Sequence, residues 1–425
     1  MTKTLLRQVR VLNPVYDTDE IADVLIVDQQ IAAIAASLTE VPDGTQVMDC
    51  AGLVLGPGLV DLYSHSGEPG FEERETLDSL LQSAIAGGFT RLTLLPDTQP
   101  ALDNPAELAW FQSQLQHRSA PVQVSHWGAL TLGTKGQQMS ELAELADAGV
   151  LGFADGKPIA NLALLRRSLE YAQALGKPMA FWCCDPELTG NGIVREGTEA
   201  LRLGLPSSPA IAETAALASV LECVADSQVP IHLMRISTAR SVDLIQAAKA
   251  RGLSITASTT WMHVLLNIKA VHSYNPSLRL NPPLGNPEDQ KALLQGLQSG
   301  VLDAIAIDHS PYTYEEKTVA FSEAPPGAIG LELALPLLWQ NLVATDEWTA
   351  LALWRTLSTH PALCLYQNPG AIAPGLPAEI TLFDPNYSWQ ATPDNLRSRS
   401  KNTPWLGQEI IGKVVKTWGS ENGHA

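Results

Sequence analysis

Residues 56–70 read Gly56-Pro57-Gly58-Leu59-Val60-Asp61-Leu62-Tyr63-Ser64-His65-Ser66-Gly67-Glu68-Pro69-Gly70. The mainly apolar run 59–62 is typical of a short buried strand, and a polar cluster with a histidine follows it directly. In a barrel of parallel strands, side chains just past the carboxyl end of a strand face the active site. We therefore expect Tyr63, His65 and Glu68 to lie at a functional site.

Apolar runs alternate with helical patterns from residue 54 onward. The expected strands are Val54–Leu62, Arg91–Leu95, Val122–Gly128, Val150–Ala154, Pro178–Cys183, Pro230–Ile236, Ser254–Ser258 and Ala304–Asp308. Alternating units of this kind predict an α/β protein of the (β/α)₈ TIM barrel type. The alternative, an open doubly wound sheet, typically carries a Gly-x-Gly-x-x-Gly loop after an early strand, and the sequence contains none.

Composition limits the classes of function. The chain has 425 residues, 45% of them hydrophobic, which is enough for one large domain and a smaller one. Its net charge is -18 and it has no lysine- or arginine-rich run, which argues against nucleic-acid binding. The five cysteines are odd in number and lack Cys-x-x-Cys spacing, which favours a reducing compartment. With neither a long apolar run nor a signal-peptide core, we expect a cytoplasmic protein without a membrane partner.

The opening stretch resembles the dihydroorotase branch of the cyclic amidohydrolase superfamily. Those enzymes carry Pro-Gly-x-x-Asp-x-His-x-His-x-Arg-Glu-Pro-Gly at this point. This chain has the same scaffold in register, but Tyr63 stands at the first histidine and Gly67 at the arginine. In the family, the His-x-His pair binds metal and the arginine binds the substrate carboxylate. The resemblance continues at the ends of the other strands and covers nearly the whole chain.

The resemblance implies six metal-ligand positions. The positions that keep a family ligand are His65, Asp155 and Asp308. The positions that hold another residue are Tyr63, Trp182 and Arg235. Zinc takes thiolate, imidazole or carboxylate ligands. Tryptophan cannot bind it, guanidinium is a permanent cation that repels it, and phenol loses its proton only near pH 10. The resemblance therefore implies a degenerate metal site.

The same comparison assigns roles in substrate binding and catalysis. Asp308 matches the family's general base, and Asn281, His309 and Gly327 match positions that contact substrate. Asp97 stands where the family has an asparagine that touches substrate, so it would place an acid near a carboxylate ligand. We expect these roles to be vestigial.

Both chain ends are β-like. Val24–Asp28 followed by Ile31–Ile34 predicts a hairpin. Residues 370–384 resemble the family's return strand, with Glu379 at an aspartate position, and Asn402–Gly407 resembles its Asn-Thr-Pro-Phe-x-Gly segment. We expect residues 1–53 and 371–425 to form a small β-sandwich domain beside a barrel of residues 54–370.

One interpretation is a non-catalytic homologue of pyrimidine biosynthesis that carries no cofactor. Some bacteria hold a catalytically inactive dihydroorotase-like chain as an assembly partner of aspartate transcarbamoylase, so the resemblance implies that partner. In this interpretation, an inward-pointing Arg235 would pair with Asp155 and Asp308, because buried carboxylates need a counter-charge.

Two other interpretations stay open. One is an active zinc-dependent dihydroorotase or related cyclic amidohydrolase, which interconverts dihydroorotate and N-carbamoyl-aspartate with one zinc ion on His65, Asp308 and Asp155. The other is a small-molecule sensor that uses the former active-site pocket. A homo-oligomer is compatible with each of them.

Overall fold

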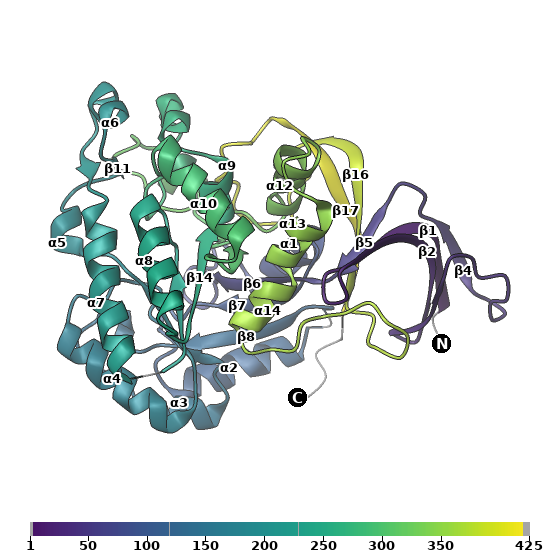
Figure 1. Ribbon diagram of the computed structural model, residues 1–425, viewed down its shortest axis with the longest axis horizontal. Coiled ribbons are helices and arrows are strands. Elements are labelled where there is room, and N and C mark those ends of the chain that lie inside the picture. The colour runs from purple at the N-terminus through teal and green to yellow at the C-terminus, as the bar shows by residue number, and fades with distance from the viewer. Residues whose placement is uncertain (1–2, 119, 228, 420–425) are drawn as a thin grey trace.

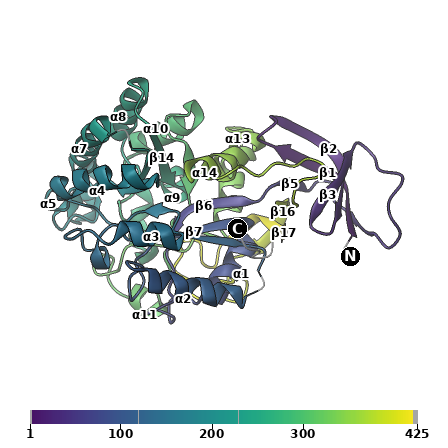
Figure 2. The ribbon, with the colours of Figure 1, turned by 90° about the horizontal axis from the view of Figure 1, so that it is seen from below.

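The computed structural model describes residues 3–118, 120–227 and 229–419. The chain forms a barrel of parallel strands wrapped by helices, with a separate sheet on one side that is built largely from the two chain ends (Figure 1). Figure 2 shows from below that strands β1, β2 and β3 of this sheet project away from the barrel. Among the described residues, no helix has both the length and the apolar composition that crossing a membrane requires.

The barrel confirms the predicted fold class. Its strands, in chain order, are β6 (Leu59–Ser64), β7 (Phe89–Leu94), β8 (Gln123–Gly128), β9 (Gly152–Phe153), β10 (Met179–Trp182), β13 (Ile231–Met234), β14 (Ile255–Thr260) and β15 (Ala304–Ala306). Neighbouring strands pair in parallel. Past the end of β15 the barrel closes onto β6: Asp308 donates its backbone N–H to Tyr63 O at 3.2 Å, and His65 donates to His309 O at 2.9 Å.

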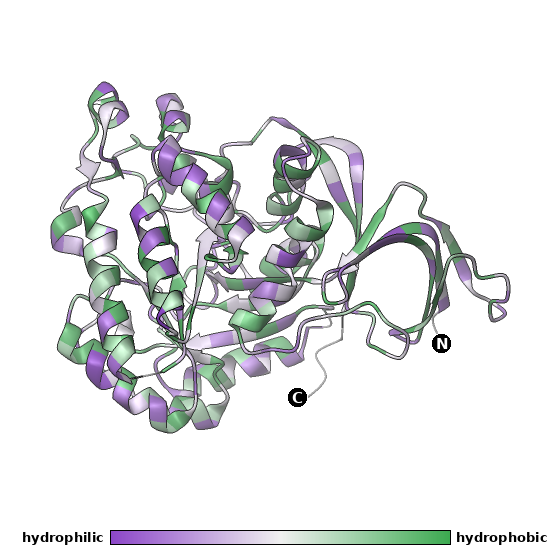
Figure 3. Ribbon diagram, in the orientation of Figure 1, coloured by the Kyte–Doolittle hydropathy of each residue, from purple (hydrophilic) through white to green (hydrophobic). Residues whose placement is uncertain are grey.

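Amphipathic helices cover the barrel, and Figure 3 shows hydrophilic and hydrophobic residues alternating around them. The longer helices are α1 (Leu77–Gly87), α2 (Pro105–Gln116), α3 (Leu142–Ala148), α4 (Leu162–Leu175), α7 (Ile211–Ser227), α8 (Ala239–Ala250), α10 (Pro287–Ser299) and α13 (Ala350–Leu357). The shorter helical segments are η1 (Leu132–Thr134), α5 (Pro186–Thr189), α6 (Thr198–Leu203), α9 (Trp261–Leu265), η2 (Ile268–Ser273), η3 (Pro276–Leu278), α11 (Tyr314–Lys317), α12 (Ala334–Leu338), η4 (Trp339–Val343) and α14 (Thr359–Cys364).

The side domain is one connected sheet, where a β-sandwich was predicted. Its strand order is β17 (Glu409–Trp418), β16 (Ile380–Gln390), β5 (Val54–Pro57), β1 (Lys3–Asn13), β2 (Thr18–Val27) and β3 (Gln30–Ala35), with β4 (Gln46–Asp49) pairing with β1. A small separate ribbon pairs β11 (Val194–Arg195) with β12 (Ser207–Ser208).

The single strand predicted for Val54–Leu62 is two strands in different sheets. β5 pairs with β16, with Pro57 opposite Ile380, whereas β6 begins the barrel at Leu59. Gly58 allows the change, because a Cβ there would lie only 2.1 Å from the Thr90 side chain. Residues 54–57, assigned to the barrel from the sequence, thus pair within the side sheet.

Two contact regions join the sheet to the barrel. Arg91 of β7 donates from Nε and Nη2 to the two carboxylate oxygens of Glu379, both at 2.7 Å. Farther along, the segment between β16 and β17 reaches the barrel mouth, where Asn402 Nδ2 donates to Ser310 O at 2.9 Å. The carboxyl-terminal segment thus supports Ser310, a residue that lines the pocket described next.

Candidate functional site

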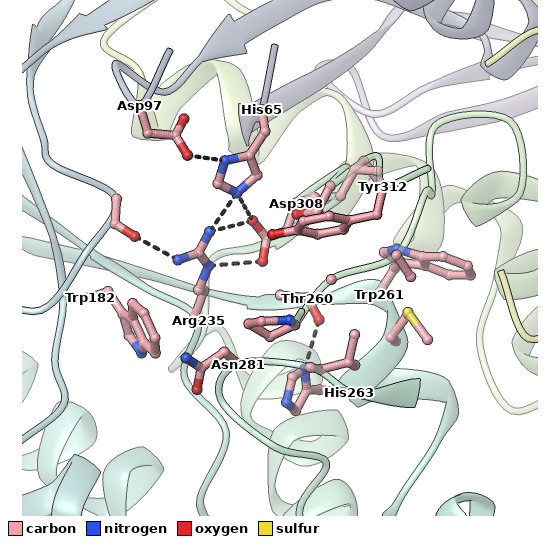
Figure 4. Close-up of a pocket in the computed structure, with 18 of the residues that line it drawn as sticks. His65, Asp97, Trp182, Arg235, Thr260, Trp261, His263, Asn281, Asp308 and Tyr312 are labelled. Carbon is pink, nitrogen blue, oxygen red and sulfur yellow. Dashed lines mark hydrogen bonds and ion pairs between the residues drawn. The ribbon is translucent and has the colours of Figure 1, made fainter. Parts of the chain in front are cut away.

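A pocket of about 230 Å³ opens at the carboxyl ends of the barrel strands. This is the end at which enzymes of this fold carry their active sites. The pocket-lining residues with polar or aromatic groups include His65, Asp97, Lys157, Trp182, Arg235, Thr260, Trp261, His263, Asn281, Asp308, Ser310 and Tyr312. Figure 4 shows how the labelled ones converge.

Arg235 occupies the centre of this constellation. Its Nε and Nη2 donate to Asp308 Oδ2 at 2.8 Å and Oδ1 at 2.6 Å, and Nη2 also lies 3.1 Å from His65 Nε2 (Figure 4). A third contact runs from Nη1 to Gly156 O at 2.8 Å. Arg235 and Asp308 both adopt positive φ, at 55° and 53°, which is uncommon for residues other than glycine. Because both oxygens of Asp308 accept from the guanidinium, the two side chains form a planar, bidentate ion pair.

His65 links this pair to a second carboxylate. Its Nδ1 lies 2.7 Å from Asp97 Oδ2 and its Nε2 lies 3.5 Å from Asp308 Oδ1. Burial alone would lower the pKa of His65, but the carboxylates of Asp97 and Asp308 raise it to about 9. The imidazole is therefore a cation at neutral pH. The floor of the pocket is thus a chain of alternating charges, Asp97, His65, Asp308 and Arg235.

The other two substituted positions pack against Arg235. Tyr63 is fully buried, and its hydroxyl accepts the backbone N–H of Arg235 at 3.0 Å and lies 3.0 Å from Ser258 Oγ. Trp182 presents its ring to the guanidinium, with Arg235 Cζ 5.0 Å from the ring centroid. Tyr63 and Trp182 therefore each contact Arg235.

Asp155 does not join them, which corrects the expected pairing of Arg235 with Asp155. Thr131 donates to its carboxylate from the backbone N at 2.9 Å and from Oγ1 at 2.5 Å. These bonds hold Asp155 outside the set of residues that line the pocket. Of the expected pair of carboxylates, Arg235 binds Asp308 alone.

Of the three positions expected to contact substrate, two line the pocket and one lies outside it. Asn281 and Gly327 line the pocket. His309 is fully buried outside it: Nδ1 accepts the Gly330 N–H at 3.1 Å, and Nε2 lies 3.2 Å from Glu75 Oε2. Both ring nitrogens are engaged within the protein, so His309 has no free polar atom to offer a ligand.

Two residues of the opening stretch also differ from expectation. Glu68 accepts the backbone N–H of Leu77 at 2.7 Å, so its carboxylate binds the first turn of α1 instead of facing the pocket. At Gly67, a Cβ would lie 2.3 Å from Glu75 O and 2.6 Å from Phe71 O. The backbone therefore excludes any side chain from position 67, including the family's arginine.

The arrangement does not fit a zinc ion. Within residues 3–118, 120–227 and 229–419, no three His, Cys, Asp or Glu side chains converge as a metal site would require. Of the candidate ligands, only His65 and Asp308 approach each other, and the guanidinium of Arg235 contacts both. A cation of fixed charge at that place repels a metal ion.

Several residues important to the site were missed or undervalued in the sequence. Thr131 belongs to no motif of the sequence, so its hydrogen bond to the Asp155 carboxylate could not be predicted. Asp97 was read only as an acid close to substrate, and its partner His65 follows a different strand. His232 bonds the hydroxyl group of Ser258, and the pocket-lining His263 bonds that of Thr260.

Comparisons with known proteins identify the family of this chain. Residues 52–241 match the family described as Dihydro-orotase-like. The chain is 44% identical over 440 residues to a "Probable dihydroorotase-like protein" of Synechocystis sp., an alignment that covers 96% of this chain and 98% of that protein. It is 38% identical over 414 residues to a "Dihydroorotase" of Pelobacter propionicus, with 97% of each chain covered. The chain belongs to the dihydroorotase-like family of amidohydrolases.

Solved structures support the fold independently. An L-hydantoinase from Arthrobacter aurescens superposes with a TM-score of 0.85 at 21% identity, over 100% of this chain and 98% of that one. A dihydropyrimidinase from Brevibacillus agri gives a TM-score of 0.82 at 20% identity, over 98% and 94% of the two chains. The shared architecture includes both the barrel and the side sheet.

Proposed function

We propose that this chain is a non-catalytic member of the dihydroorotase-like family with a degenerate metal site. The observation that carries the proposal is the position of the Arg235 guanidinium, bonded to Asp308 and in contact with His65. The family's reaction needs a metal-activated water at this place. Arg235 instead supplies a permanent positive charge that neither activates water nor exchanges ligands.

We further propose that the chain serves de novo pyrimidine biosynthesis in the cytoplasm as an assembly partner of aspartate transcarbamoylase. Support comes from the resemblance of the sequence to inactive dihydroorotase-like chains that hold this role, and from the dihydroorotase-like name of a 44% identical relative. A stable complex requires about 1,600 Å² of total buried surface. A barrel of this size offers such an area outside its pocket.

Elemental analysis and activity assays test the loss of catalysis. The chain, purified without added metal, is measured for zinc per chain and for turnover of dihydroorotate before and after zinc is supplied. We expect near-zero zinc, no turnover, and a melting temperature that a chelator does not change, because no metal stabilises the folded state. The matched control is the triple variant Tyr63→His, Trp182→His, Arg235→His, which restores the family's imidazoles and should gain zinc.

Co-assembly tests the partner. The chain is mixed with aspartate transcarbamoylase of the same organism, and the mass of the complex is measured by light scattering after size-exclusion chromatography. We expect a complex of fixed stoichiometry that also forms with the Arg235→His variant, because a scaffold role does not use the pocket. Separate elution at micromolar concentrations would contradict the proposal.

The second candidate is an active dihydroorotase with a reduced metal site. Two observations favour it: relatives at 37% and 38% identity are named dihydroorotase, and His65 Nε2 lies 3.5 Å from Asp308 Oδ1. Activity would require Arg235 to swing away and Asp155 to release Thr131. About one zinc per chain with chelator-sensitive turnover would establish this candidate and overturn the first.

A further inference from the structure

A chain of hydrogen-bonded side chains runs through the barrel interior from Arg235. The Tyr63 hydroxyl lies 3.0 Å from Ser258 Oγ, and Ser258 Oγ lies 2.8 Å from His232 Nε2. At the far end of the chain, His232 Nδ1 lies 2.9 Å from Thr256 Oγ1. Tyr63, Ser258 and His232 are at most 2% exposed. The interior of such a barrel is filled mostly by branched apolar side chains, so a polar chain here requires a reason.

Tyr63 holds both members of the central ion pair. Its hydroxyl oxygen accepts the backbone N–H of Arg235 at 3.0 Å, and its backbone oxygen accepts that of Asp308 at 3.2 Å. Both partners have a positive φ, which costs free energy in a residue with a side chain and must be maintained by the surrounding structure. The orientation of the Tyr63 hydroxyl therefore affects where the Arg235 backbone lies.

The donors and acceptors of the chain determine the direction in which its hydroxyl groups point. The backbone N–H of Arg235 can only donate, so the Tyr63 oxygen accepts it. Burial and the nearby Asp308 carboxylate raise the pKa of Tyr63, so the hydroxyl keeps its proton. The acceptor that the described residues offer to this proton is Ser258 Oγ. The opposite direction would leave a buried hydroxyl hydrogen without an acceptor, which native proteins rarely allow.

His232 completes this order. Because Ser258 accepts from Tyr63, its own hydrogen needs an acceptor, and the remaining neighbour of Ser258 Oγ within the described ranges is His232 Nε2. Nε2 must then lack a hydrogen, so the ring carries its proton on Nδ1 and donates to Thr256. Burial and the charge of Lys249 lower the pKa of His232 to about 3, so the ring is neutral at physiological pH. A neutral imidazole has one N–H and one bare nitrogen, which is what this order requires.

We propose that His232 is a positioning residue for Arg235. Its bare Nε2 orients the Ser258 hydroxyl, which orients the Tyr63 hydroxyl, and the Tyr63 oxygen then accepts the Arg235 backbone N–H. Tyr63, Ser258 and His232 all lie outside the set of residues that line the pocket. The inference deepens the proposed function and rests on it for its meaning, since it states how the guanidinium is held in the place of the metal.

The tautomer of His232 is the first test. Nuclear magnetic resonance is recorded on the full chain, labelled with nitrogen isotope in histidine only and kept in a chelator at neutral pH. The His232 signals are identified by their loss in His232→Gln. We expect the proton on Nδ1 and a bare Nε2. A proton on Nε2, or a doubly protonated ring, would overturn the proposal.

Solvent exchange of the Arg235 Nε–H is the second test. His232→Phe keeps a ring but removes the acceptor, and should speed this exchange by about tenfold, the effect of one lost buried hydrogen bond. His232→Gln offers a carbonyl oxygen near the place of Nε2 and should restore slow exchange. A role limited to filling space predicts the opposite order of the two variants, because phenylalanine resembles the ring more closely.

His126→Phe is the matched control. His126 is also a buried histidine of a barrel strand, but its ring packs against Phe111, and its Nε2 has no hydrogen-bond partner among the described residues. We expect this variant to leave the exchange of the Arg235 Nε–H unchanged. An effect as large as that of His232→Phe would show that any buried histidine of the barrel supports Arg235 equally, which contradicts a specific role for His232.

Two further outcomes would overturn the proposal: unchanged exchange in His232→Phe, and exchange in His232→Gln as fast as in His232→Phe. If His232→Phe does not fold, Ser258→Ala breaks the same chain at its middle hydroxyl, and unchanged exchange in that variant has the same meaning. All measurements are made in a chelator. Zinc-dependent turnover would therefore refute the proposed function and leave these results standing, whereas failure of the tautomer test would leave the proposed function standing.

Discussion

Arg235 supplies the positive charge that the buried carboxylate of Asp308 requires. Burial by itself would raise the pKa of Asp308, but the guanidinium holds it well below its usual value. The pair is nearly closed to solvent, with side-chain exposures of 5% and 15%. Removing one partner of a buried ion pair leaves an unpaired charge and strongly lowers the free energy of unfolding, whereas replacing both partners by apolar residues is often nearly neutral. The contribution of Arg235 is therefore visible mainly when it is removed alone.

Replacing Arg235 by methionine tests this account. We expect Arg235→Met to lower the free energy of unfolding by about 3–5 kcal/mol, because Asp308 is left buried without its counter-charge. The double variant Arg235→Met, Asp308→Asn should recover most of the loss. Urea unfolding followed by circular dichroism measures both. A single variant as stable as wild type would show that the ion pair does not compensate a buried charge.

The ionisation of His65 provides a second test. The pKa of about 9 exceeds its ordinary 6.5 because Asp97 and Asp308 outweigh burial. A raised folded-state pKa adds stability that is fully present below pH 6.5 and is lost as the pH rises through about 9. We expect NMR titration of the His65 ring to give a pKa near 9. In Asp97→Asn the pKa should fall by more than one unit, and an unchanged value would rule out the proposed cause.

Among the elements, the seam between β6 and β15 depends on one buried acid. Asp61 accepts the Ile307 backbone N–H at 2.9 Å and the Ser64 hydroxyl at 2.5 Å, which ties the first barrel strand to the last. Burial raises its pKa from 3.8 to about 7, although both hydrogen bonds oppose that rise. The folded state therefore favours a protonated Asp61, because the cost of burying the charge outweighs the two hydrogen bonds that favour the carboxylate.

The pH dependence of Asp61→Asn follows from this shift. A folded-state pKa above the unfolded one gives stability that is fully present below pH 3.8 and is lost as the pH rises to about 7. Asparagine has no such dependence. Relative to Asp61→Asn, wild type should thus lose stability between about pH 4 and pH 7 and change little above it. Parallel urea titrations at several pH values measure the difference, and a constant difference would contradict the assigned pKa.

The barrel was predictable from the sequence because its strands are apolar runs bounded by polar ends. The same signal could not separate β5 from β6, since the run 54–62 is continuous and the division depends on the packing of Gly58 against Thr90. A similar limit affects residues 334–343. There, α12 is followed by the wider turns of η4 over Trp339–Val343, which periodicity does not reveal.

The sequence indicated which residues meet at the site better than it indicated how their side chains are oriented. His65, Arg235 and Asp308 meet because each follows a barrel strand, which the sequence indicated. The orientation of each side chain depends on neighbours distant in the sequence: Thr131 holds Asp155 aside, and Glu75 fixes His309. Such contacts join segments that no local motif connects. The sequence therefore could not show which of the candidate site residues would line the pocket.

For the whole molecule, the joint between sheet and barrel rests on Glu379. Its carboxylate binds Arg91 through two bonds of 2.7 Å and accepts the Thr90 hydroxyl at 2.7 Å. The Arg91 and Glu379 side chains are mostly buried, at 15% and 19% exposure, so solvent screens the pair less than a surface pair. Thr90 also packs beside Gly58, where the chain passes from one part to the other.

Glu379→Ala tests the joint. We expect the free energy of unfolding to fall by about 1–3 kcal/mol, because Arg91 and Thr90 lose their acceptor inside the interface. Glu379→Asp, the residue of the family pattern, is the matched control and should retain more than half of this energy. Urea unfolding monitored by tryptophan fluorescence measures both variants. Equal stability of Glu379→Ala and wild type would mean that apolar packing alone holds the two parts together.

The loop around Gly67 leaves no room for a side chain. An arginine at position 67 would collide with the backbone at Phe71 and Glu75. Glu75 cannot yield readily, since its carboxylate is bound by His309 and by the backbone of Arg399. An arginine at position 67 therefore requires that the loop be rebuilt. At this position the path of the backbone, and not the choice of side chain alone, keeps the family's arginine out of the pocket of this chain.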